Sequence, residues 1–116
     1  LQCWFHHFLD SDYRVFMRFV ALEKLHRLHE GYKRAVVVDG RNLLLFQHDD
    51  QIHIVDNICP HAGAALDRGS LRGGQLICPW HGIAFDVKTG QAATCGLRLK
   101  KYPPVFEQQS VGILIE

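Results

Sequence analysis

No stretch of this 116-residue chain is apolar for long enough to cross a bilayer, and its most apolar runs, such as residues 43–46, suit short strands instead. Blocks of one charge are missing as well, because 13 Lys and Arg face 12 Asp and Glu and leave a net charge of +1. The basic footprint of a nucleic-acid or anionic-membrane binder is therefore absent, and we expect neither partner. No signal-like segment opens the chain, so the sequence favours a cytoplasmic protein.

Low-complexity and disorder-promoting segments are also scarce. Hydrophobic residues make up 47% of the chain and charged residues 22%, which is typical of a globular protein with a buried core. At this length we expect one domain, over residues 17–116. Residues 1–16 contain several aromatic side chains at irregular spacing, and we treat them as an N-terminal extension of uncertain structure.

The clearest local pattern is that of a β-meander. Asp39-Gly40, a favoured tight-turn pair, separates the apolar runs 35–38 and 43–46, which predicts a hairpin. A third apolar run follows, and its alternation around His53 indicates a strand with one solvent-facing side. We therefore predict three sequential antiparallel strands.

The flanking segments are less regular. Residues 17–30 fit either a helical stripe or a short strand at their start. Residues 57–72 are mostly Gly, Ala, Pro and polar residues and predict a long loop with at most one helical turn, and such loops usually carry function. Turn pairs at 73–74 and 89–90 and an alternating run at 111–115 predict further strands. The predicted fold is therefore all-β.

Two short segments offer the residue types that bind transition metals. Cys59-x-His61 and, sixteen residues further on, Cys78-x-x-His81 each supply one thiolate and one imidazole. Two donors of each kind suit either zinc or a mixed-ligand iron–sulfur cluster, so ligand type leaves both open. Zinc fingers usually provide their cysteines as one pair and their histidines as another. Here each loop provides one of each, which favours a cluster in which two cysteines hold one iron and two histidines hold the other.

This spacing resembles the signature of the Rieske [2Fe–2S] domains. The similarity continues beyond the metal-binding residues, for example at Gly82 and Asp86, and covers about residues 17–116. It implies an antiparallel β domain with two cluster-binding loops. It also assigns a Rieske [2Fe–2S] cluster to four ligands, which are Cys59, His61, Cys78 and His81.

The chain is most similar in pattern to the soluble Rieske-type ferredoxins of bacterial oxygenase systems. That resemblance implies an electron carrier rather than an enzyme. The carrier would take single electrons from a flavin-dependent reductase to an oxygenase or another terminal oxidoreductase. An oxygenase large subunit would need a second domain for mononuclear iron, which we do not expect here. The alternatives are a small Rieske-like subunit of a multi-component reductase of the nitrite reductase type, or a zinc-stapled binding module.

Two departures from other branches of the family narrow this expectation. Ala64 and Trp80 stand where the respiratory branch has the two cysteines of a disulfide between its cluster loops. Ile83 and Phe85 stand where high-potential members have hydroxyl groups that donate hydrogen bonds to sulfur. Because such bonds stabilise the reduced cluster, we expect a reduction potential toward the low end of the Rieske range of about −150 to +300 mV.

Two further side chains near the ligands are interpreted as packing residues. Trp80, which lies between two ligands in the sequence, is expected to pack within its loop rather than form a docking face. Cys95 is expected to be a small buried residue rather than a reactive thiol. A disulfide between Cys3 and Cys95 is neither supported nor excluded by the sequence.

Overall fold

A computed structural model describes residues 17–61, 63–80 and 82–116, and the described part is nearly all strand and loop. The predicted all-β class is confirmed, and no helix of the described residues could span a membrane. The N-terminal extension, residues 1–16, lies outside the described residues. The elements are β1 (Arg18–Lys24), the 3₁₀ turn η1 (Leu25–Arg27), β2 (Lys33–Val38), β3 (Arg41–His48), β4 (Gln51–Asp56), the 3₁₀ turn η2 (Leu66–Arg68), β5 (Ser70–Arg72), β6 (Gln75–Ile77), β7 (Ala84–Asp86), β8 (Lys101–Tyr102), β9 (Val105–Glu107) and β10 (Ser110–Ile115).

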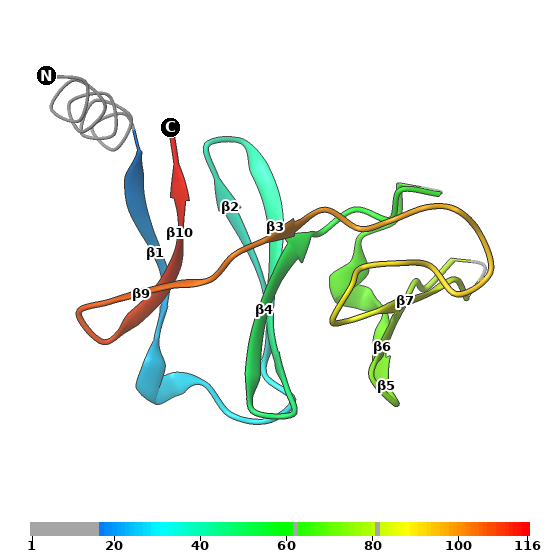
Figure 1. Cartoon of the computed structure of the whole chain (residues 1–116), viewed down its shortest axis with the longest axis horizontal. Coiled ribbons are helices and arrows are strands. Elements are labelled where there is room, and N and C mark those ends of the chain that lie inside the picture. Colours follow the sequence, from blue (N-terminus) through cyan, green and yellow to red (C-terminus); the bar gives the residue numbers. More distant parts are fainter. Residues whose placement is uncertain (1–16, 62, 81) are drawn as a thin grey trace, which may run out of the picture.

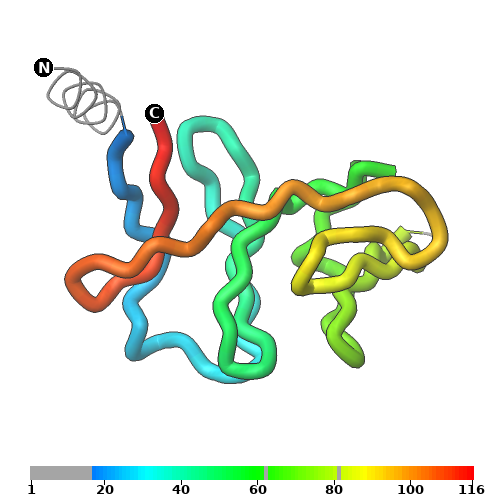
Figure 2. The backbone as a smooth tube through the Cα atoms, viewed as in Figure 1, coloured from blue at the N-terminus to red at the C-terminus, as the bar shows by residue number. Residues whose placement is uncertain are grey.

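The strands form three antiparallel sheets, ordered β1-β10-β9, β2-β3-β4-β8 and β5-β6-β7. The first two sheets lie together at one end of the long axis, and the small β5-β6-β7 sheet lies at the other (Figure 1). After β7 the chain loops round this far end and runs back to the larger sheets through β8, as the tube in Figure 2 shows. We call the first two sheets the base, and residues 57–100 the cluster end.

Two separate hydrophobic cores flank strand β3, and they explain why its central run is completely buried. Leu43 and Leu45 pack with β10 in the base core, whereas Leu44 and Phe46 pack with side chains of the cluster end. All four side chains have 0% exposure. Strand β3 is therefore the wall shared by the two halves of the molecule.

The predicted β2–β3 hairpin is confirmed. Val38 pairs with Arg41 across a two-residue turn at Asp39 and Gly40, which have φ values of +49° and +78°. Two successive positive φ values match the right-handed twist of the flanking strands, which is why Asp-Gly is favoured there.

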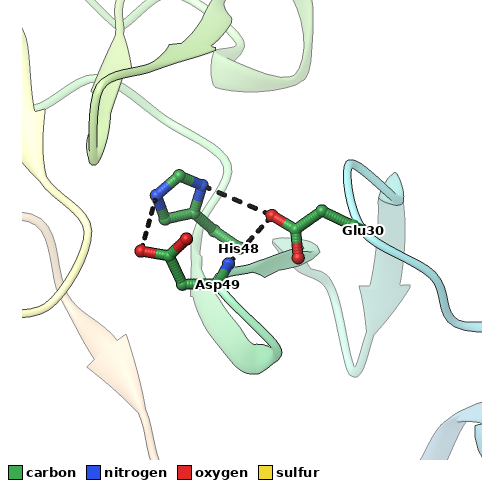
Figure 3. A group of neighbouring side chains, drawn as sticks. All are labelled: Glu30, His48 and Asp49. Carbon is green, nitrogen blue, oxygen red and sulfur yellow. Dashed lines mark hydrogen bonds and ion pairs between the residues drawn. The ribbon is translucent and has the colours of Figure 1, made fainter.

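The turn between β3 and β4 is held by a carboxylate from outside the hairpin. Asp49 and Asp50 both have positive φ, and their N–H groups donate to the two oxygens of Glu30 at 2.9 and 3.1 Å. Figure 3 shows Glu30 facing the turn, with the His48 ring beside it at 3.8 Å. Donor atoms of Glu30, His48 and Asp49 lie within 4.8 Å of one another, but the backbone amides of the turn already occupy the Glu30 oxygens. We interpret this group as a turn cap.

The ambiguous segment 17–30 forms a strand at its start and only one 3₁₀ turn after it. Strand β1 pairs with β10 from Arg18↔Ile115 to Lys24↔Ser110, with a bulge between Ala21 and Glu23. The long-range ladder with β10 prevails over the helical spacing of the leucines, because tertiary pairing outweighs weak local preference.

A buried carboxylate joins the two base sheets. Glu23 on β1 is 7% exposed, and it accepts hydrogen bonds from the Tyr32 hydroxyl at 2.5 Å and from Arg34 at 3.1 Å. The hydrogen bond from Tyr32 is the largest cause that lowers the pKa of Glu23, so the carboxyl group is held in its ionised form. A charge buried with such partners fixes how the two sheets meet.

The expectation that His53 faces solvent is wrong. Its side chain is 7% exposed, and its ring stacks on Phe46 with centroids 5.1 Å apart. Lys101 Nζ lies 3.1 Å from Nδ1 of His53 and also donates to the carbonyl of Val87 in the cluster end. The alternating pattern predicted one wet side, but the cluster end covers the side of β4 that an isolated meander would leave in water.

We expect His53 to make the protein less stable as the pH falls. Burial, assisted by the charge of Lys101, lowers the pKa of His53 from 6.5 to about 4. Between these pH values the unfolded chain binds a proton that the folded chain does not. The free energy of unfolding should therefore fall by up to about 1.4 kcal/mol per pH unit as the pH decreases through this window.

Urea denaturation of H53Q at several pH values checks this expectation. Glutamine keeps an acceptor for Lys101 without the titration, so the pH dependence between 6.5 and 4 should flatten. The exposed His26→Gln variant is the matched control and should retain the wild-type slope. Equal slopes for H53Q and wild type would show that His53 is not the group responsible.

Candidate metal centre

The two predicted cluster loops have the same internal closure. In the first loop the N–H of Cys59 donates to the carbonyl of Ala64 at 2.8 Å, and in the second the N–H of Cys78 donates to that of Ile83 at 2.8 Å. Each bond therefore spans from the cysteine to the fifth residue after it. Gly63 and Gly82 have φ values of +74° and +65°, a left-handed conformation that glycine adopts at no steric cost because it has no Cβ.

The two cysteines meet in the core of the cluster end. Cys59 and Cys78 are each 1% exposed and lie in one apolar cluster with Leu66 and Phe85. Burial raises the pKa of the Cys78 thiol, while the N–H of Trp80 donates to its sulfur and the Cys59 thiol lies within hydrogen-bonding contact. Both cysteines are free, so the loops bring two soft donors together without a disulfide.

This donor pair fits one iron of a Rieske cluster. Thiolates are the ligands that Fe–S clusters require, and the apolar surroundings of Cys59 and Cys78 exclude water from that side. Burial disfavours the free thiolate, so binding of a metal here would release the thiol proton, with the charge of the metal compensating for the lost hydration. The structure therefore supplies a thiolate side suited to the cluster.

The two predicted histidine ligands are placed less completely. His61 is exposed and follows Cys59 by two residues on the first loop. His81 lies outside the described residues, so its ligand role stays a prediction. What the described residues bring together is the cysteine pair, with one imidazole near the surface of the same end.

The positions that lack hydroxyl groups lie beside this centre. Ile83 closes the second loop through its carbonyl, and Phe85 follows on β7 with 0% exposure. Neither side chain has a polar hydrogen. Both side chains lie in or against the apolar cluster that contains the two cysteines.

Two packing expectations are wrong. Trp80 is 59% exposed, because the two cysteines and their apolar neighbours occupy the interior of this end. Cys95 is exposed on a turn that Ala92 and Leu97 close with a 2.9 Å hydrogen bond. Cys3 lies outside the described residues, so a disulfide between it and Cys95 stays untested.

One surface residue was missed by sequence reasoning. Ile58, which precedes the first cysteine, is 48% exposed, although an isoleucine next to a buried ligand reads as a core residue. With Trp80 it leaves apolar side chains at the surface beside both loops. No signal in the sequence indicated this, because the burial of Asn57 and Cys59 on either side is known only from the fold.

Comparison with known proteins agrees with this geometry. The family model for the Rieske [2Fe-2S] domain matches residues 18–103. The ferredoxin component of a naphthalene 1,2-dioxygenase system from Pseudomonas aeruginosa is 37% identical over 91 residues, which cover 77% of this chain and 88% of that protein.

Solved structures give the same result. The Sphingomonas yanoikuyae B1 ferredoxin superposes with a TM-score of 0.74 at 30% identity, over 83% of this chain and 97% of that one. A putative NADH-dependent nitrite reductase small subunit from Mycobacterium tuberculosis gives a TM-score of 0.72 at 25% identity, over 86% and 96%. This chain belongs to the Rieske [2Fe–2S] domain family and carries that type of cluster.

Proposed function

We propose that this chain is a Rieske-type ferredoxin that carries single electrons from a flavin-dependent reductase to a terminal oxygenase or another terminal oxidoreductase. The observation that carries this proposal is the buried contact between Cys59 and Cys78 at one end of the molecule. The protein is an electron carrier and not itself a catalyst. Two of its relatives are named as ferredoxin components of dioxygenase systems, which supports this role.

The ligand assignment is part of the proposal. Cys59 and Cys78 hold one iron from the buried side, and His61 and His81 hold the other. When bound, the cluster takes up one electron and gives it back without forming a bond to a substrate. Exposure of His61 supports the placing of the imidazole side at the surface, where a partner protein can approach it.

A low reduction potential follows from the residues at 83 and 85. Ile83 and Phe85 have no hydroxyl group to donate to sulfur, so the reduced cluster lacks that stabilisation. A redox titration should give a midpoint toward the low end of about −150 to +300 mV. The variants I83S and F85Y should raise it, and a strongly positive wild-type midpoint would contradict this account.

The domain boundary and the compartment also belong to the proposal. The first strand starts at Arg18 and the family match at residue 18, which supports a domain over residues 17–116. A cytoplasmic location is proposed because the cysteines that hold a cluster have to stay reduced, and thiols persist in that compartment.

A second candidate function is favoured by one observation. The putative nitrite reductase small subunit covers 86% of this chain with a TM-score of 0.72. In that role the domain would feed a large reductase subunit within one complex instead of diffusing between partners. The common element of both roles is a working cluster.

Electron transfer to purified acceptors tests the proposal and separates the two roles. The reduced protein is mixed in a stopped-flow instrument with the oxygenase component of an aromatic-ring dioxygenase, or with a nitrite reductase large subunit. We expect rapid oxidation by the oxygenase component, seen as recovery of the visible spectrum. Oxidation by the reductase subunit alone would favour the second role.

A further inference from the structure

The two cluster loops differ in how their ends are held. The second loop lies between β6 and β7, where Ile77 pairs with Ala84, so a β-ladder closes it. The first loop starts after β4, at Asp56, and ends in η2. Among the described residues these two ends share no ladder. Besides the inner hydrogen bond from Cys59 to Ala64, another interaction has to hold the two ends of the first loop together.

The side chains of Asn57 and Asp67 make that closure. Nδ2 of Asn57 donates to Oδ1 of Asp67 at 3.0 Å, and the N–H of Asp67 donates to Oδ1 of Asn57 at 2.8 Å. Asn57 is 6% exposed, and its own N–H donates to the carbonyl of Asn42 on β3 at 2.9 Å. The pair thus joins both ends of the loop and attaches them to the wall of the molecule.

The chemistry of the pair is directional. Position 67 presents one donor, its backbone N–H, and one acceptor, its carboxylate. An amide at position 57 can accept from the N–H and donate to the carboxylate. A carboxylate at position 57 could accept from the N–H but would repel the Asp67 side chain. Leu66, with 0% exposure, already anchors η2 in the core. The pair therefore adds a constraint on the loop beyond what packing of η2 supplies.

We propose that Asn57 and Asp67 are positioning residues that form a clamp holding the first loop in its ligating conformation. The clamp spans residues 58–66, which include Cys59 and His61, and performs for this loop what the β6–β7 ladder performs for the other. This inference rests on the proposed ligand assignment. With the clamp closed, the protein should lose its cluster more slowly than without it.

The variants N57D, N57D/D67N and Q108E test the clamp. N57D sets two carboxylates against each other, whereas the double variant restores one amide and one carboxylate in swapped positions. Gln108 is exposed in the turn between β9 and β10, so Q108E repeats the change from amide to carboxylate away from the loop. The rate of bleaching by an iron chelator, the electron paramagnetic resonance spectrum of the reduced protein and the far-UV melting curve are measured for each.

We expect N57D to lose its cluster about tenfold faster than wild type or more, because a buried hydrogen-bonded pair is broken. The double variant should return to within about twofold of wild type, and Q108E should match wild type. The resonance lines of N57D should broaden and those of the double variant should not.

Two results would overturn the clamp. One is bleaching of N57D at the wild-type rate, and the other is a double variant that bleaches as fast as N57D. If N57D does not fold, the bleaching rate of the double variant tests the clamp instead, because the double variant also has aspartate at position 57. The cluster content of wild type and Q108E tests the proposed function separately, because absence of the cluster from both proteins would refute the ligand assignment whatever the clamp does.

Discussion

We expect Cys78→Ala to abolish the visible absorption of the purified protein and Cys95→Ala to leave it unchanged. Both substitutions remove the same thiol group, but the two cysteines lie in different surroundings. Cys78 is 1% exposed and touches Cys59, whereas Cys95 is exposed on a turn that follows the second loop. Loss of one thiolate removes half of the protein donors to one iron, and the remaining ligands cannot hold the cluster.

Absorption spectra and iron analysis of both variants check this expectation. Far-UV circular dichroism shows whether each variant keeps its strands. Retention of the brown colour by C78A, or its loss in C95A, would mean that the cysteine assignment is wrong. The pair of variants therefore tests the site with a control that carries the same substitution.

We expect the second large effect at Phe46, which links the base to the cluster end. Its side chain has 0% exposure, lies on the cluster-end side of β3 and stacks on His53. F46A should lower the free energy of unfolding by about 3–5 kcal/mol, because truncation of a buried aromatic residue removes burial and leaves a cavity. That is a large part of the about 5–15 kcal/mol that usually stabilises a domain.

Phe106 offers the matched control for this substitution. It lies on β9 and is 55% exposed, so F106A should change the free energy of unfolding by less than about 1 kcal/mol. Urea denaturation followed by far-UV circular dichroism gives both values. Similar losses for the two variants would contradict the description of β3 as the shared wall of two cores.

The features that the sequence predicts correctly depend on residues close together along the chain. The turn at Asp39-Gly40 follows from backbone conformation alone, and the spacing of Cys59 and Cys78 with their neighbouring histidines indicated the centre before any geometry was known. Turn chemistry and metal-ligand spacing act over a few residues, so they can be read along the chain.

The parts that sequence reasoning got wrong or missed depend on contacts between distant segments. His53 is buried because the cluster end covers β4, and Trp80 is exposed because other side chains fill the interior beneath it. Asn57 and Asp67 each look like ordinary loop residues, and only the fold shows that they close the same loop. Alternation and side-chain size carry no information about such partners.

Iron and acid-labile sulfide analysis of the purified protein, with electron paramagnetic resonance of its reduced form, tests the central claim most directly. The account predicts equimolar iron and sulfide and the spectrum of a cluster with mixed thiolate and imidazole ligands. Stoichiometric zinc without acid-labile sulfide would contradict it, and would leave the Cys59–Cys78 pair as a structural metal site.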